Sequence, residues 1–231
     1  MNNLGKSWRT VSISAGLSWL MKLLLLGITP YQVYNGEYLY ALATFIAFII
    51  SLIPSVVERN YRITLPFELD LLFTLMVFLH AFMGEVMDLY SKFELYDKAL
   101  HLYGGVVIAM LGFLVVYTLH YTRKVRLSLP LVGFFTISFT MAVGAMWEIG
   151  EFTVDKFFST HAQNGLDDTM FDMVVDLIGG VVVSVLGMVY VRFSHPDERI
   201  RLARPLGEVF GAGAKLDRIR KRLKREKKER A

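Results

Sequence analysis

Long uninterrupted apolar segments constrain this chain more than any other feature. A helix that crosses the ~30 Å hydrocarbon core of a bilayer needs roughly 20 mostly apolar residues. Three segments of about this length carry no charged residue, and a fourth carries only Asp176. They are residues 38–57, 102–119, 127–147 and 173–191. In a water-soluble domain so much apolar sequence would leave too little polar surface to cover the fold. We therefore expect an integral membrane protein.

Two further segments complete the expected set of spans. The segment 69–87 is apolar except for three ionisable residues, namely Asp70, His80 and Glu85. The segment 11–29 holds Lys22, and a charge inside a span costs ~2.5–3.5 kcal/mol on insertion scales. Lys22 must therefore reach the membrane surface or meet a carboxylate of another helix. No small-x-small cleavage site accompanies this segment, which favours a retained helix over a signal peptide.

The sequence thus predicts an all-α, polytopic transmembrane helix bundle of six spans. The expected spans are about residues 11–30, 38–57, 67–90, 98–121, 127–155 and 170–192, within a membrane domain over 1–192. A basic tail over 193–231 follows them. Cysteine is absent, which excludes disulfides and thiolate metal ligands.

The distribution of Lys and Arg between the loops sets the expected orientation. Basic residues gather at both ends of the chain and in alternate loops, as Lys6/Arg9, Arg59/Arg62 and Arg123/Lys124/Arg126. By the positive-inside rule, both termini are expected in the cytoplasm. Two termini on the same side of the membrane require an even number of spans, and six satisfies this.

The basic tail predicts a partner as well. From Lys215 to Arg230 it has ten Lys or Arg against three acidic residues, with no nucleic-acid-binding module in the sequence. Leu216, Ile219 and Leu223 are spaced as one apolar face of a helix, which suits the anionic lipids of the inner leaflet. A solvated charged extension is the alternative.

Ionisable residues gather in the outer half of this topology. Asp97 and His101 are four residues apart, Glu148 and Glu151 three, and Asp168, Asp172 and Asp176 form a ladder of two four-residue steps. On a helix such spacings place side chains on one face. Buried like charges need protons, basic partners or a metal to compensate them. Nearer the membrane surface, Asp88, Asp155 and Asp168 are expected to be solvated.

The residue types suggest roles for this cluster. Carboxylates with imidazole suit a divalent ion such as Mg²⁺, Mn²⁺, Ca²⁺ or Zn²⁺. The predicted ligands are Asp97, His101, Asp172 and Asp176, and the predicted general bases are Glu148 and Glu151. His80, alone on its segment, is expected to be a hydrogen-bonded core residue.

Two pairs of expected helices share a pattern, which predicts a parallel repeat of the hairpins over 67–121 and 127–192. Asp97, His101 and Gly104-Gly105 align with Asp172, Asp176 and Gly179-Gly180. Gly105-x-x-x-Ala109 and Gly180-x-x-x-Ser184 are small-residue surfaces of the kind that let helices approach closely. Close backbones there would bring the polar side chains of the two helices into one pocket.

A family resemblance rests on these motifs. The sequence has Leu-Tyr-Asp97-Lys98-x-x-His101, then Trp147-Glu148-x-x-Glu151, then Gly165-x-x-Asp168-Thr-x-x-Asp172-x-x-x-Asp176. Over roughly residues 69–191 it resembles the YjdF-like bacterial inner-membrane proteins, a family that implies no particular activity. More loosely it is similar to VanZ-like membrane proteins, which are associated with glycopeptide resistance, but Asp176 stands near the place of their usual Asn.

Three functions fit these observations. The first is an enzyme in which a divalent metal activates water against an envelope or lipid-linked substrate. The second is an accessory membrane protein whose polar cluster is structural, with the carboxylates paired to Lys22, Lys98 or Lys156. The third is an ion or proton transporter, although the polar residues sit at one face and no polar path continues through 129–146. The sequence leaves the choice open.

Overall fold

The protein is seen in a computed structural model that describes residues 13–229. Within that range the regular elements are all helical and no strand occurs. Six segments are long and apolar enough to cross a membrane, which confirms the predicted all-α class and its six candidate spans. They are Ile13–Tyr34 (α1), Tyr38–Tyr61 (α2), Pro66–Val86 (η1, α3 and η2), Tyr96–Tyr121 (α5), Leu129–Phe158 (α6) and Leu166–Phe193 (α7). Lys6, Arg9 and the expected start of the first span lie outside the described residues.

The chain separates into two compact units. The first contains α1, α2, α3 (Leu69–Phe78), η2 (Leu79–Val86) and α4 (Leu89–Lys92). The second contains α5, α6, α7, α8 (Pro196–Val209) and α9 (Gly213–Glu229). The division into a membrane domain over 1–192 and a tail over 193–231 stays a prediction, as does the internal repeat.

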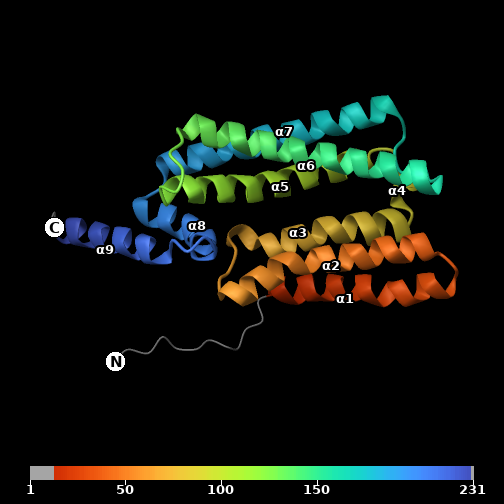
Figure 1. The fold of residues 1–231 in the computed structure, drawn as a ribbon, viewed down its shortest axis with the longest axis horizontal. Helices are drawn as coiled ribbons and strands as arrows, with labels where there is room; N and C mark the ends of the chain where they lie inside the picture. The colour runs from red at the N-terminus through yellow and green to blue at the C-terminus, as the bar shows by residue number, and fades with distance from the viewer. Residues whose placement is uncertain (1–12, 230–231) are drawn as a thin grey trace. The chain divides into compact units, whose positions relative to one another are not determined.

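In the first unit α1 packs against α3, and the three long helices lie side by side (Figure 1). Their apolar core consists of Met21, Leu25, Ala47, Val77, Phe78 and Ala81. After Phe78 the helix widens into the π-helical turns of η2. Widened turns of this kind often occur at functional sites. Here the Nδ1 atom of His80 hydrogen-bonds the Tyr90 hydroxyl at 2.7 Å, as expected for a core histidine.

A buried ion pair joins α1 to α3 in the same unit. The Lys22 side chain is fully buried, and its Nζ atom donates to Asp70 Oδ1 at 2.8 Å. Two hydroxyls complete the network: Ser18 donates to Asp70 Oδ2 at 2.6 Å and Ser55 to Asp70 Oδ1 at 2.7 Å. Lys22 also donates to both hydroxyls. Of the two outcomes expected for Lys22, the carboxylate of another helix is the one found.

The second unit is a bundle of three long antiparallel helices with two shorter helices at one end (Figure 1). α5, α6 and α7 each pack against the other two, while α8 packs on α5 and α9 on α8. Because the three helices alternate in direction, the start of α5, the end of α6 and the start of α7 lie at one end of the bundle. The end of α5 and the two short helices lie at the other.

The ion pair predicts a large effect of neutralising one partner. Lys22→Met leaves the Asp70 carboxylate without its counter-charge, which we expect to cost about 3 kcal/mol of stability because a buried charge is then uncompensated. Thermal unfolding of the detergent-purified protein measures it. Adding Asp70→Leu should restore most of the loss. Lys92→Met, at an exposed lysine of the same unit, should change the stability by less than about 0.5 kcal/mol. Equal losses in both lysine variants would contradict a structural ion pair.

The orientation can be tested with single cysteines, because the chain has none of its own. Asn60→Cys and Asn164→Cys replace exposed asparagines, one near the end of α2 and one in the loop between α6 and α7. The expected topology puts these two positions on opposite sides of the membrane. If the basic loops face the cytoplasm, a membrane-impermeant maleimide added to intact cells should label Asn164→Cys and leave Asn60→Cys unlabelled. Lysed cells should label both. The reverse pattern would invert the topology.

Candidate functional site

Glycines bring α5 and α7 together at the end of the bundle where the acidic residues lie. A Cβ atom built on Gly179 would lie 3.0 Å from the backbone nitrogen of Val106 and 3.1 Å from the carbonyl carbon of Gly105. A Cβ on Gly105 would lie 3.1 Å from the Cα of Asp176. A side chain at either position would therefore push the helices apart.

The α5–α7 contact thus uses Gly105 and Gly179. The expectation that Gly180 and Ser184 line it is wrong, because both face α6. A Cβ on Gly180 would lie 3.3 Å from Thr140, and one on Gly133 would lie 2.6 Å from Ser184 Oγ. Adjacent residues on a helix point about 100° apart. Gly179 therefore faces α5, whereas Gly180 faces α6. Gly144 of α6 also faces the Asp176 carboxylate. This carboxylate of α7 therefore lies against glycines of both α5 and α6.

Lys98 is the first centre of the cluster. Its Nζ atom donates to Asp97 Oδ2 at 3.1 Å, to Asp172 Oδ2 at 2.7 Å and to Asp168 Oδ1. Asp168, expected to be a solvated surface residue, is therefore part of the site. The signal was present in the sequence, since Asp168 shares a helix face with Asp172.

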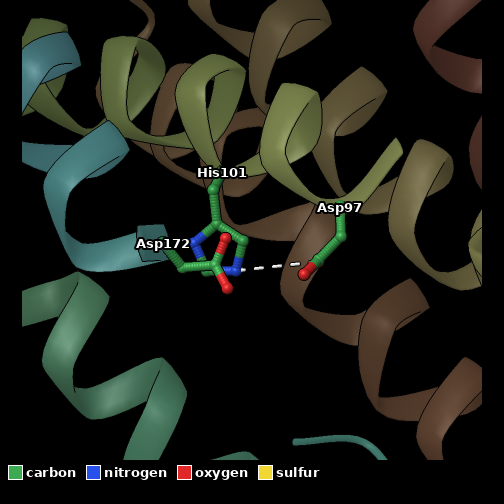
Figure 2. A group of neighbouring side chains, drawn as sticks. All are labelled: Asp97, His101 and Asp172. Carbon is green, nitrogen blue, oxygen red and sulfur yellow. Dashed lines mark ion pairs between the residues drawn. The ribbon is translucent and has the colours of Figure 1, made fainter. Parts of the chain in front are cut away.

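His101 is the second centre. Its Nδ1 atom lies 3.4 Å from Asp176 Oδ2, and its Nε2 atom lies 3.6 Å from Glu148 Oε1 and 3.8 Å from Asp97 Oδ1. Figure 2 shows Asp97 and His101 of α5 and Asp172 of α7 directed toward one another. The nearest ligand atoms of these three residues all lie within 4.8 Å of each other. The structure therefore brings together five of the six predicted site residues.

The cluster holds more carboxylates than basic groups. Five carboxylates, those of Asp97, Glu148, Asp168, Asp172 and Asp176, contact Lys98 or His101. If all are ionised, three negative charges remain even with His101 protonated. Glu148 Oε1 and Asp172 Oδ1 are buried and accept no hydrogen bond in the described part of the chain. Unsatisfied buried oxygens of this kind are costly, and a further donor or a cation would remove that cost.

The donor set fits a divalent cation. Two carboxylates and one imidazole within a sphere of this size can contract onto Mn²⁺ or Zn²⁺, whose bonds to such ligands are about 2.0–2.2 Å. Asp176, also a predicted ligand, lies beside His101 rather than in the three-residue group. It is placed to orient the imidazole, as carboxylates commonly do for metal-bound histidine.

The remaining acidic residues of α6 have different surroundings. Glu151 accepts a hydrogen bond from Trp147 Nε1 at 2.8 Å, one helical turn before it. Asp155 accepts bonds from Thr160 Oγ1 at 2.6 Å and from the Ala162 nitrogen at 2.7 Å, so it fixes the loop that follows α6. Glu148 is therefore the glutamate of α6 that lies against His101.

The sequence is similar to that of a family of membrane proteins. The sequence pattern of a family described as "Predicted membrane protein (DUF2238)" matches residues 13–193. A protein of Thermotoga maritima, described as "Uncharacterized protein", is 33% identical over 159 residues, which cover 67% of this chain and 80% of the relative. No solved structure matches. These matches confirm the expected resemblance to a membrane-protein family of unknown function, while the looser similarity to VanZ-like proteins stays a prediction.

The glycine contact predicts which small substitution disrupts the site. Gly179→Ala places a Cβ against the α5 backbone, and overpacking of this kind typically costs about 1–3 kcal/mol. We expect a lower thermal unfolding midpoint of the purified protein. The control is Gly150→Ala on α6, where no atom lies within 4 Å of the added Cβ. There the higher helix propensity of alanine should leave the stability unchanged or raise it by up to about 1 kcal/mol. Equal effects at both positions would contradict the close contact.

Proposed function

We propose that this chain, a member of the family described as predicted membrane proteins (DUF2238), is a metal-dependent membrane protein. In this proposal its carboxylate–histidine cluster binds one divalent cation. Asp97, His101 and Asp172 would supply the ligands. The observation that carries the proposal is the pair of buried, unsatisfied oxygens, Glu148 Oε1 and Asp172 Oδ1, in a cluster with surplus negative charge.

The proposed activity is hydrolysis of an ester bond in an envelope or lipid-linked substrate at the outer face of a bacterial inner membrane: water adds to the phosphoryl or carbonyl centre, the ester bond breaks, and the leaving oxygen takes up a proton. A divalent cation held by Asp97, His101 and Asp172 would lower the pKa of water and polarise the phosphoryl or carbonyl oxygen. Glu148 is the best-placed general base, because its Oε1 atom lies 3.6 Å from His101 Nε2 and the residue is 4% exposed. Glu151, one turn further along α6, would accept the proton in a more open position.

The topology supports the location of this activity. Lys and Arg concentrate in the loops at the end of the bundle away from the cluster, so the positive-inside rule puts the cluster outside and both termini in the cytoplasm. The same orientation brings the basic tail to the anionic inner leaflet. Contact of that tail with anionic lipids is therefore part of the proposal.

A second candidate function has an observation of its own. Lys98 contacts Asp97, Asp168 and Asp172 at once, as expected if the cluster only holds α5 and α7 together. In that case the protein would be an accessory membrane component. A cation at Asp97 and Asp172 would have to share both carboxylates with the Lys98 ammonium. A substitution of Lys98 therefore has different expected effects under the two candidate functions.

Metal binding to the detergent-purified, chelator-treated protein tests the proposal. A calorimetric titration with Mn²⁺ or Zn²⁺ should show one metal-binding site per chain. His101→Ala and Asp172→Asn should each lower the metal affinity by at least about tenfold. Removing a residue that only supports a ligand already lowers metal affinity by about that much, and removing the ligand itself should cost more. The control Asp167→Asn removes an exposed carboxylate one residue before Asp168 and should leave binding unchanged.

Lys98→Met then decides between the two candidates. A metal site predicts that cation affinity stays the same or rises, since a competing ammonium is removed. A structural cluster predicts no saturable metal binding in the parent protein and a strongly lowered unfolding midpoint in Lys98→Met. Absence of metal binding would end the metal-dependent proposal.

A further inference from the structure

A cluster of opposite charge lies at the other end of α5. Asp97 and His101 are in its first two turns, whereas His120 and Tyr121 end it, and 20 residues of helix span roughly 30 Å. A cavity of ≈ 980 Å³ opens beside that end. Its walls come from the end of α5, the loop before α6, α8 and α9. We call it the basic groove.

The lining of the basic groove combines positive charge with apolar surface. Its permanent cations are Arg123, Arg126, Arg199, Lys215 and Arg222. Among the described residues that line it, none is acidic. The apolar part is supplied by Val125 and Leu127 of the loop and by Ile219 and Leu223 of α9. An occupant must therefore carry negative charge and also present an apolar portion.

Packing holds the walls of this groove in place. Leu216 of α9 is 1% exposed, and a Cβ on Gly207 of α8 would lie 2.5 Å from its Cδ1 atom. Lys124 donates to the carbonyl of Phe210, which ties the loop to the turn between α8 and α9. The Arg199 guanidinium donates to the carbonyls of Ser194 and Arg192, each at 3.1 Å. The segment after α7 is therefore a docked element over its described part.

Three carboxylates of α8 and α9 are engaged outside the groove. Asp217 and Glu208 both pair with Arg204, at 3.1 Å and 3.6 Å, and neither lines the groove. Glu198 accepts from the backbone nitrogen of His195 at the start of α8. None of these three carboxylates is therefore a partner of the groove's basic residues in these contacts.

We propose that the basic groove binds the headgroup of an anionic phospholipid of the inner leaflet. The phosphodiester would lie among the arginines, which suit phosphate oxygens through paired N–H donors. The apolar residues would contact the glycerol and the first part of the acyl chains. A membrane lipid is the occupant because the groove begins where a membrane span ends, and because a free phosphate would leave the apolar wall uncovered. The inference rests on the proposed inward orientation of the tail.

Lipid retention by the full-length protein tests this inference. The purified protein is incubated in detergent with equal amounts of phosphatidylglycerol and phosphatidylcholine, and bound lipid is counted by native mass spectrometry. Phosphatidylglycerol should be retained and phosphatidylcholine not. The groove variant, Arg126→Gln with Lys215→Gln, should weaken retention by about 25-fold, since each basic residue near an anionic surface contributes about fivefold. Excess inorganic phosphate should not displace the lipid.

A matched variant separates the groove from the tail as a whole. Arg218→Gln with Lys221→Gln also removes two charges from the chain, but these exposed residues of α9 lie outside the groove. It should lower retention by less than about twofold. Equal losses in both variants would overturn the groove while keeping general contact of the tail with lipid. Retention that is equal for both lipids, or displacement by phosphate, would overturn the headgroup assignment. Lack of anionic-lipid retention in the parent protein would remove both.

Discussion

Compensation of buried negative charge is the constraint on which the second unit depends. The contact through Gly105 and Gly179 draws α5 and α7 so close that their polar residues must share one space. Lys98 and His101 offset part of the resulting charge, and two buried carboxylate oxygens remain unsatisfied. Since an uncompensated buried charge is strongly destabilising, the proposed cation would complete the charge balance of the site. Cation binding and stability would then be linked, because the ion would also hold the helices together.

In the first unit a partly buried carboxylate is compensated fully, with no surplus of negative charge. Lys22 meets Asp70, and hydroxyls of Ser18 and Ser55 take up the remaining hydrogen-bonding capacity. The pair is a balanced one-to-one arrangement, so it has no need of a ligand. The cluster around His101 has more carboxylates than basic groups, and that difference separates a structural ion pair from a candidate site.

Much of this could be predicted from the sequence because membrane spans are read from length and hydropathy alone. The gathering of Asp97, His101, Glu148, Asp172 and Asp176 followed from topology and helical spacing. Three features did not follow. Lys98 as the centre of three carboxylates depends on the rotation of α5 against α7, which spacing within one helix does not fix. The choice of Gly179 over Gly180 depends on the same rotation. The basic groove required the docking of α8 on α5, because a run of basic residues alone is equally compatible with a solvated tail.

The central claim is that the cluster around His101 binds a divalent cation through the imidazole. Electron spin-echo spectroscopy of Mn²⁺ added to the chelator-treated protein reports directly on nitrogen bonded to the metal. The account predicts modulation from an imidazole nitrogen, which disappears in His101→Ala and persists in Asp167→Asn. A spectrum of fully hydrated Mn²⁺ without nitrogen coupling in the parent protein would contradict it.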